Sequence, residues 1–276
     1  MMGAASSASA AVGHALVAAT SGPSPLWYAT RATGVVALVL LTITVTLGVA
    51  GTARFSSVSM PRLVQSGLHR NVSMVSVGFV AAHVLTAVLD PYASIRLTSA
   101  VIPFGSHYRM FWLGLGTIAF DLLLALVLTS LLRNRLGYRP WRGVHWLAYA
   151  SWPIALWHGL GTGTDTRLPG LLLLDALCVL AVGAAVLWRL RLVRPGRLRV
   201  TWLVATAAIA VATVAFVATG PLQPGWARRA GTPSNLLPSA GSAAAAAISP
   251  SAMHVSEPSV VVVGGQRAAT SPGGAR

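Results

Sequence analysis

Six long apolar segments alternate with short polar stretches along the chain. They cover residues 26–50, 69–89, 110–132, 144–161, 170–188 and 200–219. Each is close to the ~20 apolar residues that a helix needs to cross a bilayer, and none shows the alternation of a half-buried strand. The pattern predicts an all-α integral membrane protein built as a bundle of six transmembrane helices.

The two ends of the chain differ from this middle part in composition. Residues 1–24 are rich in Ala, Ser and Gly, and from Gly220 onward the chain is rich in Pro, Gly, Ser and Ala. Such sequences bury too little apolar surface to fold alone, and residues 1–24 lack the basic start of a secretion signal. We therefore expect a flexible N-terminus over 1–24, a membrane domain over 25–220 and a low-complexity, disordered tail over 221–276.

Composition narrows the class further. Of 276 residues, 55% are hydrophobic and only 9% are charged, whereas a soluble domain carries roughly 25% charged residues. The net charge of +15 comes from arginines in short loops between apolar segments. Arginines in such places orient membrane helices, so we expect a lipid bilayer and no nucleic acid as partner. The single cysteine, Cys178, excludes an intrachain disulfide.

The arginines also predict the topology. Twelve of them follow the first, third and fifth apolar segments or begin the next one, and six lie on the opposite side. The arginine-rich side is expected to be cytoplasmic. The chain is then a multi-pass protein of the cell membrane, with both termini outside the cytoplasm and with its second and fourth helices running in the same direction.

Four of the seven histidines lie at matching positions: His69 and His83 in the second segment, His145 and His158 in the fourth. The spacings of 14 and 13 residues correspond to roughly 20 Å along a helix. One histidine of each helix then lies toward each leaflet of a hydrocarbon core of about 30 Å. His69 can face His145, and His83 can face His158. Each pair offers two axial imidazoles to the iron of an electron-transferring haem.

Helix geometry favours one spacing over the other. Fourteen steps of about 100° return His83 to within ~40° of the face of His69, whereas thirteen leave His145 and His158 ~140° apart. Pro153 lies between the latter two and can kink or rewind the backbone. The alternative is that all four are polar residues hydrogen-bonded between packed helices. Four such costly groups in one membrane domain favour a functional role.

The residues around these histidines resemble a known family. Segment 68–83 reads LHRNVSMVSVGFVAAH, segment 141–165 reads WRGVHWLAYASWPIALWHGLGTGTD, and LTSLLRNRLGYRP precedes the latter. Over roughly residues 26–190 the chain is similar to the ferric-reductase-like transmembrane domain of ferric reductases, NADPH oxidases and the haem subunit of bacterial methionine sulfoxide reductase systems. The resemblance implies two b-type haems, ligated by His69 with His145 and by His83 with His158, and electron transfer from the inner haem to the outer one.

The chain departs from the larger oxidases of this family. It shows no G-x-G-x-x-G fingerprint between a strand and a helix, and its C-terminal tail is expected outside the cytoplasm. We therefore expect an oxidoreductase component, a cytochrome b subunit that needs a separate donor, either quinol or a flavoprotein. The acceptor on the outside would be ferric iron, oxygen or a partner redox protein.

Three further residues are candidates. Arg70 can pair with a haem propionate, although an arginine that only sets orientation is an equal alternative. Asp121 and Asp175 are intramembrane carboxylates, candidates for a proton or quinone role against simple hydrogen bonding. The rival functions for the whole chain are a non-redox transporter or scaffold, and a haem sensor.

Overall fold

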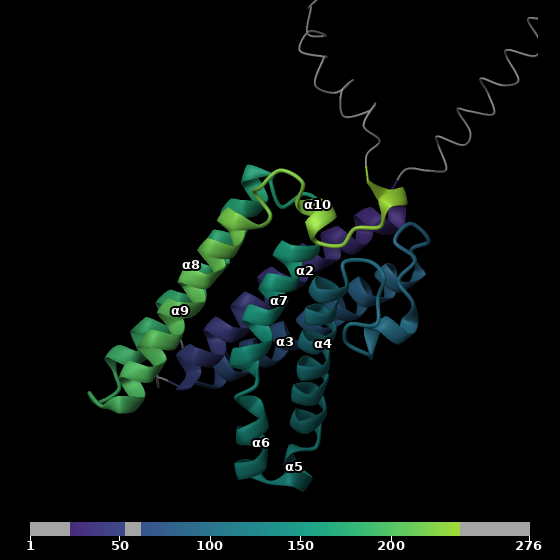
Figure 1. The fold of residues 1–276 in the computed structure, drawn as a ribbon. Helices are drawn as coiled ribbons and strands as arrows, with labels where there is room; N and C mark the ends of the chain where they lie inside the picture. Colours follow the sequence, from purple (N-terminus) through teal and green to yellow (C-terminus); the bar gives the residue numbers. More distant parts are fainter. Residues whose placement is uncertain (1–22, 53–61, 238–276) are drawn as a thin grey trace, which may run out of the picture. The chain divides into compact units, whose positions relative to one another are not determined.

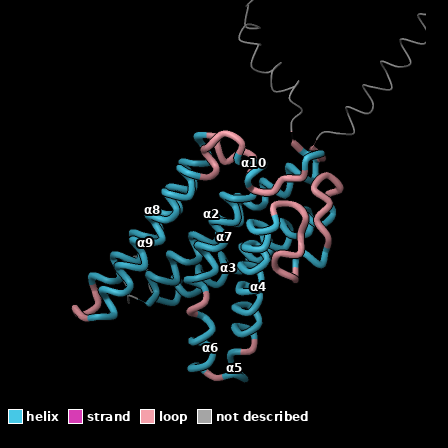
Figure 2. Tube along the Cα trace, viewed as in Figure 1, coloured by secondary structure: helices cyan, strands magenta, loops and turns pink. Residues whose placement is uncertain are grey.

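The computed structural model describes residues 23–52 and 62–237, and these residues form helices and loops without a β-strand (Figure 2). The long helices, labelled in Figure 1, are α2 (Pro25–Thr52), α3 (Arg62–Leu89), α4 (Met110–Leu131), α8 (Pro169–Arg191) and α9 (Arg197–Thr219). All five are long and apolar enough to cross a membrane. The predictions of an all-helical fold and of a multi-pass membrane protein are confirmed.

The outward faces of the long helices fit a lipid environment. Four large apolar side chains of α8 and α9 expose between 62% and 70% of their surface: Leu173, Leu180, Val211 and Val214. Soluble proteins rarely expose contiguous apolar patches of this kind. Lipid tails accept such a surface, so the exposed sides of α8 and α9 face the bilayer.

The segment expected as the fourth membrane helix is interrupted. It is divided into α6 (Tyr138–His145) and α7 (Ala148–Thr162), preceded by the short α5 (Arg133–Leu136). Pro153 lies inside α7, where it carries no N–H for the Tyr149 carbonyl four residues earlier; the interruption itself lies just before this point, at Trp146 and Leu147. With 15 residues, α7 is shorter than the five candidate spans, so the count of six membrane helices stays a prediction.

Helix α7 lies at the centre of the packing. Antiparallel helices α2 and α3 pack along each other, α4 packs on α7, and α8 packs on α2. Three residues of α7 (Trp152, Leu156 and Leu160) form a buried cluster with Cys178 of α8. The Trp152 indole N–H donates a hydrogen bond to Thr42 Oγ1 of α2 at 2.9 Å. These contacts hold α7, which carries His158, between α2 and α8.

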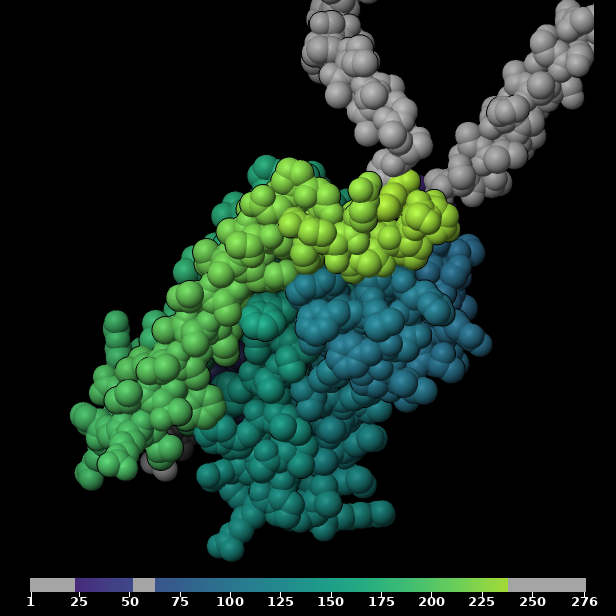
Figure 3. All heavy atoms as spheres, in the orientation of Figure 1, coloured from purple at the N-terminus to yellow at the C-terminus, as the bar shows by residue number. Residues whose placement is uncertain are grey.

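Residues 221–237 are folded, which corrects the prediction that the disordered tail begins at residue 221. They contain α10 (Trp226–Arg229) and the 3₁₀ helix η2 (Ser234–Leu236). In Figure 3 this yellow-green segment lies across the blue loop that joins α3 to α4 and contains η1 (Leu97–Ala100). The rest of the predicted tails, residues 1–22 and 238–276, lies outside the described residues.

A buried arginine explains why this segment folds. Arg109 is 1% exposed; its Nε donates to Thr232 Oγ1 at 2.9 Å and its Nη1 to the Gly161 carbonyl at 2.8 Å. The Arg109 backbone N–H also donates to the Gly231 carbonyl at 3.0 Å. A buried guanidinium needs such acceptors, so the side chain and the backbone of this one residue join the start of α4 to the end of α7 and to residues 231–232.

Candidate functional site

The structure brings the four histidines of α3 and α6–α7 together in two pairs. The ring centroids of His69 and His145 are 6.4 Å apart with the ring planes at 71°. Those of His83 and His158 are 6.1 Å apart with the planes at 79°. The two histidines of α3 are 14 residues apart, so the pairs are separated by about 20 Å along this helix.

The interruption between α6 and α7 turns His145 and His158 toward the same side. The backbone N–H groups of Trp146, Leu147, Tyr149 and Ala150 each bond the carbonyl three residues earlier, at 2.9–3.3 Å. A 3₁₀ step rotates the chain by about 120°, against about 100° for an α-helical step. Four tightened steps therefore reduce the offset of about 140° to about 60°, which lets both imidazoles face α3.

Backbone carbonyl groups orient three of the four imidazoles. The Nδ1 atom of His69 lies 3.1 Å from the Thr44 oxygen, that of His83 lies 2.8 Å from the Thr30 oxygen, and that of His158 lies 2.9 Å from the Trp112 oxygen. A carbonyl oxygen only accepts hydrogen bonds, so each Nδ1 carries the proton. Each Nε2 then keeps its lone pair, the state in which histidine binds a metal.

A glycine lies four residues after each of these carbonyl groups. A Cβ atom at Gly34 would come within 2.9 Å of the His83 ring, one at Gly48 within 3.3 Å of the His69 ring, and one at Gly116 within 2.4 Å of the His158 ring. In a helix the carbonyl of residue i already accepts the N–H of residue i+4. Without a Cβ atom at i+4, the second lone pair of that oxygen is open to the imidazole.

Sequence reasoning missed these glycines, although the sequence carries a signal for them. Gly34 and Gly48 are 14 residues apart, as are His69 and His83. Because α2 and α3 are antiparallel, equal spacings on the two helices place one glycine opposite each histidine. Thr30 and Thr44 repeat with the same spacing, so the pattern T-x-x-x-G occurs twice in α2.

His145 differs from the other three. Its Nδ1 is buried and has no hydrogen-bond partner among the described residues. Its ring instead stacks on Trp141, with centroids 4.9 Å apart and planes at 29°.

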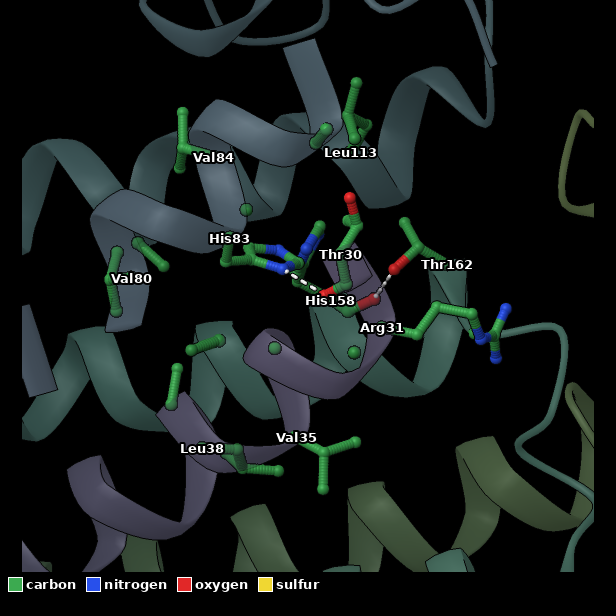
Figure 4. A pocket seen from close by; sticks show the side chains of 18 of the residues that line it. Thr30, Arg31, Val35, Leu38, Val80, His83, Val84, Leu113, His158 and Thr162 are labelled. Atoms are coloured by element: carbon green, nitrogen blue, oxygen red, sulfur yellow. Dashed lines mark hydrogen bonds between the residues drawn. The ribbon is translucent and has the colours of Figure 1, made fainter. Parts of the chain in front are cut away.

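A cavity of about 610 Å³ adjoins the second pair. His83 and His158 line it together with apolar side chains of α2, α3 and α4, including Val35, Val80 and Leu113 (Figure 4). At its edge, Arg31 Nε forms an ion pair with Asp165 Oδ2 at 2.6 Å, and Arg31 Nη1 donates a hydrogen bond to Thr164 Oγ1. The space is therefore apolar inside, with a charged and hydroxyl-rich margin.

Comparison with known proteins identifies this part of the chain. The model of a family described as "Ferric reductase like transmembrane component" matches residues 33–156. Over this range the chain is similar to the ferric-reductase-like transmembrane family. The matched range includes Gly34, Gly48 and Gly116 and three of the four histidines, and it ends two residues before His158. Neither the curated proteins nor the solved structures that were compared gave a match.

The remaining predicted residues differ in their exposure and in whether they line the cavity. Arg70 is exposed on α3, beside His69. Asp175 of α8 is half-buried and lines the 610 Å³ cavity, whereas Asp121 of α4 is half-buried and does not line it. Of the two carboxylates, only Asp175 lines the cavity that His83 and His158 also line.

Proposed function

We propose that this protein holds two b-type haems, one between His69 and His145 and one between His83 and His158, and transfers electrons across the cell membrane. The ferric-reductase-like family associates the chain with transmembrane electron transfer in general. The observation that carries the finer proposal is the pairing of four histidines at two depths, with each pair at a similar separation.

The residues fit the group. A metal–imidazole bond of about 2.0 Å and a ring radius of about 1.1 Å put the centroids of two axial imidazoles about 6 Å apart. The observed separations are 6.1 and 6.4 Å. Three rings have Nδ1 engaged by a carbonyl group, which leaves Nε2 for the metal. The apolar lining of the 610 Å³ cavity suits a porphyrin face.

The residues of the chain orient the ligands. When bound, haem b supplies an iron that takes up and releases single electrons. Carbonyl groups of α2 and α4 fix the ring planes of three histidines. Arg70 is the side chain nearest in sequence to His69 that can pair with a propionate.

The proposed direction of transfer is outward. Arg133, Arg135 and Arg142 lie at the α5–α6 end of the bundle, the same end as His145, and an excess of arginine marks the cytoplasmic side. Electrons from a cytoplasmic flavoprotein or from membrane quinol would enter at the His69/His145 level. They would leave from the His83/His158 level to ferric iron, oxygen or a redox protein outside.

Purified protein tests the proposal directly. We expect a low-spin b-type spectrum after dithionite reduction and two haems per chain by the pyridine haemochrome method. Replacing His83 or His158 with alanine should remove one haem of the two. The matched control is His107→Ala, because His107 is exposed in the loop before α4 and this variant should keep both. Colourless protein from haem-supplemented cells would refute the proposal.

A further inference from the structure

Three of the four histidines are supported by the same local arrangement, called a unit here, and His145 is the one without it. A unit consists of a histidine on one helix and, on the antiparallel neighbour, a carbonyl group followed four residues later by a glycine. The three complete copies are His69 with Thr44 and Gly48, His83 with Thr30 and Gly34, and His158 with Trp112 and Gly116.

His145 has no such unit. It precedes His158 by 13 residues, so the position that corresponds to Gly116 lies 13 residues further along the antiparallel α4, at Thr129. Threonine carries a branched Cβ atom that covers the carbonyl one turn earlier. The buried Nδ1 of His145 accordingly has no acceptor among the described residues. The two residues that follow His145, Trp146 and Leu147, lie between helices α6 and α7, so the backbone offers this ligand less support than the other three receive.

Trp141 takes the place of the missing unit. Its indole stacks on the His145 ring one helical turn later, at 4.9 Å and 29°. The Trp141 indole is itself held from two sides: its Nε1–H donates to Ser130 Oγ of α4 at 3.3 Å, and Arg133 lies over its ring at 4.5 Å. Stacking fixes the plane of an imidazole as a hydrogen bond does, although it engages the ring face and leaves Nδ1 unbonded.

We propose that Trp141 is a positioning residue that holds His145 as an axial ligand through this stack, with Ser130 and Arg133 fixing the indole. This inference rests on the proposed function, because it concerns one of the four ligands assigned there. It makes the His69/His145 site the one whose ligation depends on an aromatic side chain. The His83/His158 site depends on carbonyl groups at both ligands.

The test compares Trp141→Ala with Trp141→Phe in the purified haem-loaded protein. The readouts are haem content, the low-spin electron paramagnetic resonance signals and carbon monoxide binding after dithionite reduction. A bis-histidine haem has no free position for carbon monoxide, whereas a haem that has lost one ligand binds it. We expect Trp141→Ala to bind carbon monoxide at one haem per chain, at least tenfold more than the parent, and Trp141→Phe to stay close to the parent.

The control is Trp146→Ala. Trp146 is also close to His145 in sequence, but its ring contacts Tyr149 and Trp202, at 5.7 and 5.6 Å. This variant should bind no more carbon monoxide than the parent. The unchanged low-spin signal of the His83/His158 haem, about 20 Å away, serves as an internal measure of folding in every variant.

The outcomes separate this inference from the proposed function. A parent protein without haem would refute both. A parent with two low-spin haems and a Trp141→Ala variant with unchanged signals would overturn the role of Trp141 alone. If Trp141→Ala loses both haems, the double variant Ser130→Ala/Arg133→Ala decides, because it removes both contacts that hold the indole and keeps the indole itself. Carbon monoxide binding at one haem in this double variant supports the inference, and parent-like behaviour overturns it.

Discussion

Substituting Gly116 with alanine isolates the support of one histidine from the rest of the fold. A Cβ atom at this position would lie 2.4 Å from His158 Nδ1, 2.5 Å from Cε1 and 2.9 Å from Cγ. Ordinary contacts of a Cβ atom begin near 3.4 Å, so the imidazole must retreat by about 1 Å. The Nδ1 hydrogen bond to the Trp112 carbonyl, now 2.9 Å long, would then exceed the distance at which such a bond forms.

The magnitude follows from these two losses. Overpacking of a well-packed site costs about 1–3 kcal/mol, and a lost hydrogen bond adds about 1 kcal/mol. Together the two losses amount to about 2–4 kcal/mol. Since about 1.4 kcal/mol corresponds to a factor of ten, the affinity for a haem between His83 and His158 should fall roughly 30- to 700-fold. The same reasoning predicts a graded series: Gly34→Ala, with its Cβ 2.9 Å from His83, is less severe, and Gly48→Ala, at 3.3 Å from His69, is the mildest.

Haem stoichiometry and the thermal midpoint in detergent measure the series. The matched control is Gly183→Ala in α8, where a Cβ atom meets nothing within 4 Å; alanine should stabilise this helix by about 0.5–1 kcal/mol. Gly116→Ala should retain the His69/His145 haem and lose the other. A Gly116→Ala protein with two haems and parent-like low-spin signals would refute the reasoning about close approach.

Three further predictions concern the helices that carry the ligands. Pro153→Ala restores a helical N–H for the Tyr149 carbonyl inside α7, so the neighbouring 3₁₀ bonds of Tyr149 and Ala150 should relax toward α-helical geometry, His145 should turn away from α3 and haem content should fall from two to one per chain. Arg109→Met leaves two carbonyl groups at the end of α7 and one hydroxyl without a donor in a buried place, which should cost about 3 kcal/mol or more and lower the thermal midpoint strongly; a parent-like midpoint would contradict this. Arg31→Gln breaks the pair with Asp165, whose carboxylate side chain is 45% exposed, so unfolding in denaturant should show a change below about 1 kcal/mol. A larger loss would mean that the pair also supports the adjacent cavity.

The sequence predicts the parts of this fold that depend on periodicity and composition. Apolar runs identify five of the expected membrane helices, because their length is set by the bilayer. The spacing of His69 and His83 indicates that they share one face, because helix rotation is regular over α3. These features are local, so one chain segment is enough to recognise each of them.

Features that depend on contacts between distant segments were missed. The folding of residues 221–237 depends on Arg109, a hydrogen-bond donor more than a hundred positions earlier, and the local composition gives no sign of it. The supporting carbonyl groups of Thr30 and Thr44 carry no side-chain signature at all. The sequence shows them only through the equal spacing of the two T-x-x-x-G patterns, Thr30 with Gly34 and Thr44 with Gly48.

The 13-residue spacing of His145 and His158 requires an interruption of the helix, and the residues around this interruption determine how His145 is supported. On an uninterrupted helix His145 would point away from α3, so the chain must be rewound between the two histidines, and the 3₁₀ steps after His145 do this. At the level of His145, α4 carries Thr129 at the position that corresponds to Gly116, and the Nδ1 of His145 has no hydrogen-bond partner among the described residues. A side chain from within α6 can still reach the ring, because Trp141 and His145 are one turn apart and keep their contact however α6 is tilted. The stack on Trp141 is therefore the form of support that an interrupted helix allows.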